Sequence, residues 1–422
     1  MRKIALHGGT PVMSSPVNAN YPGALVMGAE EAESLVKIAT ARSPFRYYGI
    51  DMQHQVRRFE EDFAAYMDVR YALGVTSCTA ALHVAMKALE IGYGDKVAVP
   101  AMTFLATAGA VVASNAVPVF VDVDDSIGMD PADLDRKLGA DPEIRAVIIV
   151  HLLGYPCDLE GLIAVAKKHG VPVVEDVAQS CGSSYRGRRC GTFGDIGVYS
   201  FQMNKIITSG EGGALVTNDP RLFARAVRFH DQGIIRDKEY YGVSSPEEED
   251  AFIGLNYRMS EFTGAVLVEQ LAKLDDLIKN MREVHDILVH RISQQLPDLQ
   301  LRRLFDADGA AGCSFAIQLS NETKAQAMIE GLNAENITAY LLYEGKPLFK
   351  RDIFQHRRSA EKHGFPYHYP FQQPLDYSDE SCLKAIELSP RTVFMPIVPT
   401  LTKEDAEAMA KGIVSVYRTL LK

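Results

Sequence analysis

The sequence predicts an α/β protein with a mostly parallel, seven-stranded sheet, followed by a smaller α+β domain. Between about residues 71 and 219, short runs rich in Val and Ile alternate with helical segments, which is typical of a parallel sheet buried on both faces. The chain of 422 residues is longer than one hydrophobic core usually supports, which favours two domains. A second set of helix and strand patterns follows residue 254. We therefore expect a large domain over 1–254, with an N-terminal arm, and a small domain over 255–422.

The elements of the expected sheet follow one another in regular alternation. Each expected strand is short and apolar, and turn or helix signals bound it. The seven strands are expected at 71–75, 96–99, 117–123, 146–150, 171–176, 198–201 and 213–217. The helices between and after them are expected at 80–89, 106–114, 131–138, 159–169 and 221–230. Gly170 directly follows one of these helices and is a typical helix stop.

The second domain is expected to begin with a long helix over about 260–292. A strand at 314–319, a helix around 324–332 and a terminal helix from about Lys403 complete it. The stretch 346–377 is rich in Pro, His and Tyr and has neither a helical nor a strand period. No element is predicted there.

Composition and charge exclude several classes of protein. Hydrophobic residues make up 47% of the chain and charged residues 23%, the balance of a globular protein. The formal net charge of −10 argues against a nucleic-acid or acidic-membrane surface, since such partners need a positive field. No apolar run approaches the roughly 20 residues that span a bilayer, and the start lacks the apolar core of a signal peptide, so we expect a cytoplasmic location. The six cysteines form no CxxC pair and the histidines lack metal-ligand spacing, so neither a disulfide nor a metal is expected.

A helix start after the first strand is a candidate phosphate site. In Val75-Thr-Ser-Cys-Thr-Ala-Ala-Leu, the strand ends and a helix begins near Thr79. The first turn of a helix has free N–H groups and the positive end of the helix dipole, both of which suit a phosphate. Cys78 and Thr79 occupy this turn, and the alternative is a plain Ser/Thr N-cap.

Two further candidates follow buried strands of the same sheet. Asp176 lies at the carboxyl end of its strand, where α/β folds bind ligands, and could keep a pyridinium nitrogen protonated; the alternative is a cap of the next turn. Lys205 lies between an apolar strand and a glycine turn. A partly desolvated lysine can form a Schiff base, whereas an isolated lysine is more often a solvated surface group. A phosphate-binding helix start, a strand-end Asp and a strand-end Lys are together what a pyridoxal-phosphate site requires.

The segments around these residues resemble the DegT/DnrJ/StrS sugar aminotransferases. In chain order they are Val75-Thr-Ser-Cys-Thr-Ala-Ala-Leu-His, Pro100-Ala-Met-Thr-Phe-Leu-Ala-Thr-Ala, Pro118-Val-Phe-Val-Asp-Val, Glu175-Asp-Val-Ala-Gln-Ser, Gly194-Asp-Ile-Gly-Val-Tyr-Ser-Phe, Thr208-Ser-Gly-Glu-Gly-Gly and Leu255-Asn-Tyr-Arg-Met-Ser-Glu. The resemblance covers most of the chain. It implies fold type I of the pyridoxal-phosphate enzymes, the fold of aspartate aminotransferase, in a homodimer with shared active sites.

The resemblance also implies roles for individual residues. Lys205 would carry pyridoxal 5'-phosphate as a Schiff base, and Asp176 would pair with its pyridine nitrogen. Gln179 would hydrogen-bond the ring hydroxyl, and Phe104 would stack on the ring face. The phosphate would be held by four residues, the last of them reaching across from the partner: Cys78, Thr79, Ser200 and Asn256.

The resemblance implies amino transfer from glutamate or glutamine to a nucleotide-linked keto sugar or a keto cyclitol. The opening Leu6-His-Gly-Gly-Thr-Pro-Val resembles the inosose aminotransferases in particular. In Ser43-Pro-Phe-Arg-Tyr-Tyr-Gly, Arg46 and Tyr48 are candidate substrate contacts, while Arg46 could equally be a structural cation. Arg258 is a third candidate, with a surface ion pair as its alternative.

Three other functions compete with this interpretation. One branch of the family has a histidine in place of the lysine and removes a hydroxyl, and Lys205 argues against that dehydratase-like branch. Another fold-type-I reaction, such as dehydration or sulfur transfer, is the second alternative; sulfur transfer normally needs a reactive cysteine, and no cysteine here has an obviously electropositive setting. The third alternative is a cofactor-binding regulator. A regulator has no need of a complete set of Lys205, Asp176 and Gln179, and the chain carries no basic DNA-binding module.

Overall fold

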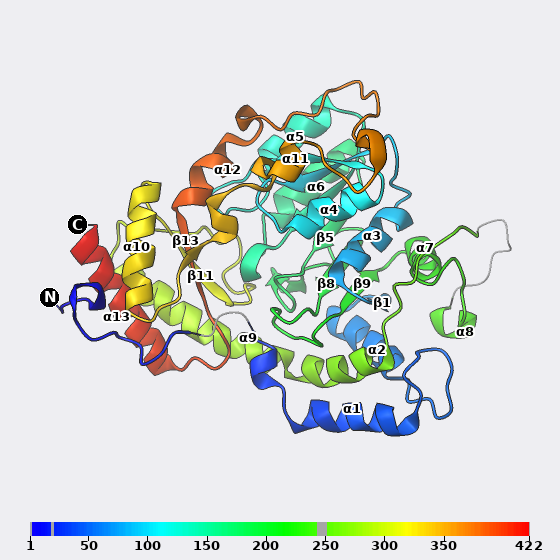
Figure 1. The fold of residues 1–422 in the computed structure, drawn as a ribbon, viewed down its shortest axis with the longest axis horizontal. Helices are drawn as coiled ribbons and strands as arrows, with labels where there is room; N and C mark the ends of the chain where they lie inside the picture. Colours follow the sequence, from blue (N-terminus) through cyan, green and yellow to red (C-terminus); the bar gives the residue numbers. More distant parts are fainter. Residues whose placement is uncertain (1, 18–20, 243–250, 422) are drawn as a thin grey trace.

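The computed structural model describes residues 2–17, 21–242 and 251–421. In Figure 1, a large sheet lies among helices, and a smaller sheet lies beside it, next to α10 (Glu322–Ala334) and α13 (Lys403–Leu420). Within the described residues, no helix is both long enough and apolar enough to cross a membrane. The cytoplasmic location stays a prediction.

Seven strands form the large sheet, as the sequence predicts. Their order in space is β1-β9-β8-β5-β4-β2-β3. The neighbours from β8 to β3 are parallel, whereas β9 runs antiparallel to both β1 and β8. The strands are β1 (Tyr71–Val75), β2 (Lys96–Pro100), β3 (Val117–Val121), β4 (Ile144–Val150), β5 (Val173–Asp176), β8 (Ile196–Ser200) and β9 (Gly213–Thr217). The predicted fold class, a mostly parallel α/β sheet, is confirmed.

Helices cover both faces of this sheet because its strands are apolar on both sides. Along β4, Val147 and Ile149 belong to the core beneath the helices α2, α5, α6 and α9, and Ile148 belongs to the core beneath α3, α4 and α7. These helices are α2 (Gln55–Met67), α3 (Cys78–Ala88), α4 (Leu105–Ala113), α5 (Pro131–Ala140), α6 (Leu159–His169), α7 (Pro220–His230) and α9 (Glu261–Gln295). Shorter or outlying elements are α1 (Ala29–Ala41), β6 (Ser184–Tyr185), β7 (Arg188–Arg189) and α8 (Lys238–Tyr241).

The small sheet has four antiparallel strands in the order β10-β11-β13-β12. They are β10 (Gln300–Leu301), β11 (Ser314–Gln318), β13 (Thr392–Pro396) and β12 (Tyr340–Leu341). The long helix α9 packs against α1 and α2 as well as against α13, so it joins the two sheets. The division of the chain at residue 254 stays a prediction.

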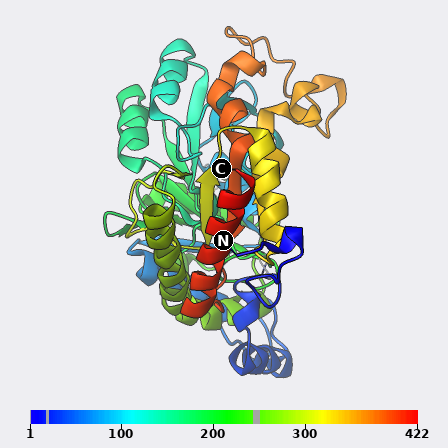
Figure 2. The ribbon, with the colours of Figure 1, turned by 90° about the vertical axis from the view of Figure 1, so that its left-hand side faces the viewer.

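The N-terminal arm packs against the C-terminal part of the chain. Figure 2 shows the two termini close together beside α10 and α13. The buried carboxylate of Glu335 accepts hydrogen bonds from Arg2 and from the backbone N–H groups of Ala5 (2.7 Å) and Val12 (2.8 Å). The opening Leu6-His-Gly-Gly-Thr-Pro-Val is therefore part of this anchored turn.

The stretch 346–377, for which the sequence predicts no element, folds as short turns over the edge of the large sheet. It contains α11 (Asp352–Gln355), and α12 (Leu383–Leu388) follows it. Tyr377 donates a hydrogen bond of 2.7 Å to the carbonyl of Pro118, and its ring packs edge-on against Phe120 of β3. Phe120 also contacts the rings of Phe349 and Phe354. The stretch thus covers strand β3.

Candidate active site

Asp176 ends β5 and forms a buried acidic centre. Only 4% of the residue is exposed. Its carboxylate accepts hydrogen bonds from the Thr107 hydroxyl (2.9 Å) and the Ala178 N–H (3.1 Å). Burial raises the pKa of this carboxyl, while the two hydrogen bonds and the positive charge of Lys205 act against the rise.

This environment fits a cationic ligand. Both hydrogen-bond donors to Asp176 are neutral, and within the described part of the chain the carboxylate forms no salt bridge. A buried carboxylate is costly unless a positive charge accompanies it. A pyridinium nitrogen would supply that charge.

Lys205 lies in the loop between β8 and β9, close enough for its charge to act on Asp176 and Cys78. Several contacts fix the backbone of this loop. Gly23 donates its N–H to the Lys205 carbonyl (3.1 Å), and a side chain at Gly23 would clash with the loop, since its Cβ would lie 2.9 Å from the Cα of Ile207. The buried amide of Gln270 accepts the Thr208 N–H (3.1 Å). These contacts therefore hold the backbone on either side of Lys205 in place.

The predicted phosphate site lies at the start of α3, and its role stays a prediction. Ser77 is the N-cap, and its hydroxyl accepts the Ala80 N–H at 3.1 Å. Among the described residues, the N–H groups of Cys78 and Thr79 have no acceptor, as expected in a first helical turn. The helix thus begins at Cys78, one residue before Thr79 and two residues before the expected range 80–89.

Strand β9 passes directly beside this turn. A Cβ on Gly213 would lie 2.4 Å from the Ser77 carbonyl carbon, so only glycine allows the approach. Ser200 ends the neighbouring β8, which pairs with β9 at Gly213. The structure therefore brings Cys78, Thr79 and Ser200 to one edge of the sheet.

Gln179 and Phe104 flank the acidic centre. Gln179 follows β5, and its side-chain amide contacts the Leu153 N–H (3.2 Å) and the Tyr343 hydroxyl (3.0 Å). Phe104 precedes α4 and is 57% exposed, and its ring centre lies 6.3 Å from that of Tyr343. An exposed aromatic ring at this edge is available for stacking.

The sequence did not assign Thr107 or Tyr343 to the site. Thr107 lies within the segment Pro100-Ala-Met-Thr-Phe-Leu-Ala-Thr-Ala, which carries part of the family resemblance, so the sequence did contain a signal that could have indicated it. Its partner Asp176 is 69 residues away in the chain. Tyr343 lies 164 residues from Gln179, next to the stretch without a readable pattern.

A buried His151–Glu175 pair supports the same strand end. His151 Nδ1 accepts the Cys157 N–H (3.2 Å), so Nε2 carries the hydrogen and donates it to Glu175 (3.1 Å). Glu175 also accepts three backbone N–H groups of the loop 191–194, each at 2.6 Å. These bonds fix the strand that ends in Asp176.

Arg46 and Tyr48 lie on a loop before α2. Arg46 is buried and donates to both carboxylate oxygens of Glu60 (2.7 and 2.8 Å) and to the Gly74 carbonyl (3.1 Å). In this structure Arg46 therefore forms a buried ion pair, and a substrate contact would require breaking it; its role as a substrate contact stays a prediction. Tyr48 is 67% exposed, and its role as a substrate contact stays a prediction.

Asn256 and Arg258 lie on an extended segment beside β1. Arg258 pairs with the buried Asp231 and lies over the Phe45 ring. Asn256 is exposed, and its only described side-chain contact is the Arg258 N–H at 3.5 Å. Their roles at a shared site stay predictions.

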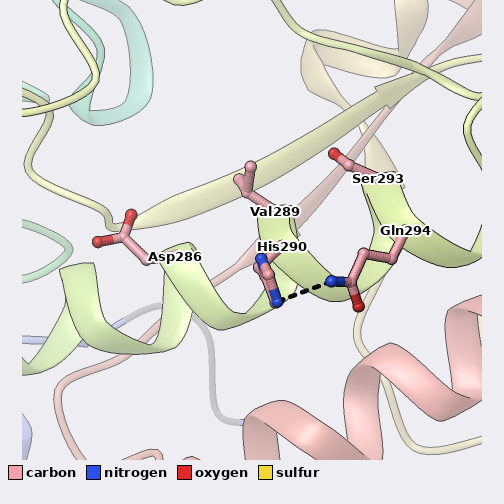
Figure 3. Close-up of a pocket in the computed structure, with 5 residues that line it drawn as sticks. All are labelled: Asp286, Val289, His290, Ser293 and Gln294. Atoms are coloured by element: carbon pink, nitrogen blue, oxygen red, sulfur yellow. Dashed lines mark hydrogen bonds between the residues drawn. The ribbon is translucent and has the colours of Figure 1, made fainter.

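A separate hollow of about 470 Å³ lies along α9. Figure 3 shows its lining, in which Gln294 donates a hydrogen bond to His290 at 3.0 Å. The lining residues are Asp286, Val289, His290, Ser293 and Gln294. It contains none of the predicted site residues.

The sheet topology, the buried carboxylate and the adjacent lysine define a pyridoxal-phosphate enzyme of fold type I. The model of the DegT/DnrJ/EryC1/StrS aminotransferase family matches residues 39–368, and the chain belongs to this family. The family resemblance, the fold type and pyridoxal 5'-phosphate as the cofactor, all predicted from the sequence, are confirmed.

Individual relatives agree with this assignment. GDP-perosamine synthase of Escherichia coli O157:H7 is 40% identical over 239 residues, which are 56% of this chain and 63% of that protein. The L-glutamine:2-deoxy-scyllo-inosose aminotransferase of Streptoalloteichus tenebrarius is 35% identical over 300 residues, which are 69% and 68% of the two chains. The crystal structure of 3-amino-5-hydroxybenzoic acid synthase matches with a TM-score of 0.80 at 25% identity. The match covers 96% of this chain and 100% of the synthase chain. The match to the GDP-perosamine synthase thus spans just under two thirds of the length of that protein.

Proposed function

We propose that this chain is an aminotransferase that moves an amino group from glutamate or glutamine to the ketone of a nucleotide-linked sugar or of a cyclitol. The observation that carries the proposal is the buried Asp176 carboxylate, which forms no salt bridge among the described residues and lies close enough to Lys205 for the lysine charge to act on it. The names of the relatives, a GDP-sugar synthase and an inosose aminotransferase, support the two substrate classes.

When bound, pyridoxal phosphate supplies an electron sink and a carrier for the amino group. Lys205 Nζ would hold the cofactor covalently and, once free, would take a proton from the α carbon of the donor and deliver it to the aldehyde carbon of the cofactor. Asp176 would hold a proton at the ring nitrogen by its charge. Gln179 would donate to the ring hydroxyl, and Phe104 would cover one ring face.

The phosphate is proposed to lie at the start of α3. The N–H groups of Cys78 and Thr79 and the Ser200 hydroxyl act as donors there. Burial raises the pKa of the Cys78 thiol, so the thiol is neutral and does not repel the phosphate. Cys78 would bind the phosphate through its backbone N–H.

We also propose a homodimer in which Asn256 of one subunit completes the phosphate site of the other. Exposed apolar side chains near Asn256 support a subunit contact, with Ile253 92% and Leu255 44% exposed. The loop that carries Tyr48 and Ile50 adds further exposed apolar groups, 67% and 76% exposed.

Mixed dimers test the shared site. Lys205→Ala and Asn256→Glu are each expected to be inactive, the second because its charge repels the phosphate. If the site is shared, a mixed dimer has one site with both defects and one intact site, so mixing should restore about half of the wild-type activity per dimer.

The matched control mixes Lys205→Ala with Asp176→Ala. In the proposed arrangement, one subunit supplies both of these residues to a given site, so both sites of the mixed dimer stay defective. That mixture should restore nothing. Verified Lys205→Ala/Asn256→Glu mixed dimers without activity would reject the shared arrangement.

The acceptor class has its own test. Enzyme loaded with pyridoxamine phosphate is incubated with a panel of keto sugars and keto cyclitols, and the return of the aldehyde cofactor is followed by absorbance. We expect return with at least one cyclic polyhydroxy ketone. Return with simple aliphatic keto acids alone would overturn the proposed substrate class.

A further inference from the structure

The hydrogen bonds of the Gln179 side chain determine its orientation. A backbone N–H can only donate, so the atom facing the Leu153 N–H at 3.2 Å must be the amide oxygen. The amide nitrogen then faces the Tyr343 hydroxyl at 3.0 Å and donates one of its two hydrogens to it. The other hydrogen remains for a ligand.

The main chain at Tyr343 is held in an unusual conformation. Tyr343 (φ 51°, ψ 36°) and Glu344 (φ 63°, ψ 24°) are both left-handed, which L-residues adopt at an energetic cost. The Tyr343 carbonyl accepts hydrogen bonds from Arg351 (3.2 Å) and from the Lys346 N–H (3.3 Å). The surrounding structure therefore maintains a turn that the local sequence disfavours.

The turn carries the phenol into the site. Tyr343 belongs to the segment after β12, yet its hydroxyl contacts Gln179, which follows β5 of the large sheet. Burial raises the pKa of this phenol, and the charge of Asp176 adds to the rise. The phenol is therefore a neutral group close to the acidic centre.

We propose that Tyr343 is a positioning residue that fixes the Gln179 amide, so that its second N–H is aimed at the ring hydroxyl of the cofactor. The inference rests on the proposed function, because it assumes the role given to Gln179. A donor at the ring oxygen draws charge from that oxygen. The oxygen then stabilises the proton on the nitrogen of the Lys205–cofactor bond less well.

The sign of the expected effect follows from this. In Tyr343→Phe the amide loses one acceptor and its fixed direction, so its bond to the ring oxygen weakens. The ring oxygen then keeps more negative charge, and the pKa of the Lys205–cofactor nitrogen should rise by roughly half a unit. The pKa is read from the visible absorbance of the loaded enzyme as a function of pH.

The pair of variants Tyr343→Phe and Gln179→Ala separates positioning from a general structural role. If Tyr343 acts through Gln179, the shift caused by Tyr343→Phe should disappear in a Gln179→Ala background. Tyr340→Phe is the matched control, because it removes a hydroxyl three residues away from the one that accepts the Gln179 amide hydrogen. It should leave the titration unchanged.

Each result has one meaning. An unchanged titration in Tyr343→Phe, or an equal shift with and without Gln179, would overturn the inference while leaving the proposed function intact. A lower melting temperature without a pKa shift would show Tyr343 to be structural only. Wild-type protein that never forms a covalent Lys205–cofactor bond would overturn both proposals.

Discussion

Lys205→Ala should abolish covalent attachment of the cofactor and lower the rate of amino transfer by roughly 10⁴-fold or more, since both a nucleophile and a proton carrier are lost. We propose Lys205 for both roles, because its loop lies close enough to Asp176 for the lysine charge to act on that carboxyl. The backbone contacts of Gly23 to this loop do not involve the lysine side chain, so the variant should fold.

Borohydride reduction of the loaded enzyme followed by peptide mapping measures the attachment. The label should appear on the peptide that contains Lys205 and should be absent from Lys205→Ala. Lys167→Ala, on the exposed side of α6, is the control and should label like the wild type. A label on another lysine of the wild type would refute the assignment.

Asp176→Asn should still bind the cofactor but transfer the amino group roughly 10²-fold to 10⁴-fold more slowly, because a neutral amide cannot stabilise a ring cation by charge. The amide can keep the present hydrogen bonds: its oxygen can accept the Ala178 N–H, and the Thr107 hydroxyl can accept as well as donate.

The stability of the same variant gives an independent readout. Burial raises the pKa of Asp176, so removing the charge should leave the melting temperature of the cofactor-free protein unchanged or raise it. Asp195→Asn is the control. Asp195 lies directly before β8, where its carboxylate accepts the Val173 N–H at 2.8 Å, and it is outside the proposed site. An Asp176→Asn rate within a few-fold of wild type would contradict the role given to Asp176.

The large sheet could be predicted because each strand is a continuous apolar run with clear ends. The helices α1 and α2 were not predicted, because neither has a Ser, Thr, Asp or Asn cap: Gly28 and His54 occupy these positions. The strands β10 and β12 have two residues each, too few for an alternating pattern. Tertiary contacts, rather than local signals, determine these elements.

The candidate site divides in a similar way. Asp176, Lys205 and the α3 start follow strands of one sheet, so topology alone brings them to one edge. The sequence could not decide between the alternatives for Arg46, because its partner Glu60 lies in an unpredicted helix. Tyr343 carried no signal, since a left-handed tyrosine in an irregular turn has no sequence signature.

The anchoring of the N-terminal arm to Glu335 has a consequence for synthesis on the ribosome. The Ala5 N–H and its acceptor are 330 residues apart in the chain. All strands of the large sheet are translated before the anchor exists. Residues 5–12 therefore stay undocked while that sheet assembles and reach their final position only after α10 has emerged, although they are made before every strand of the sheet.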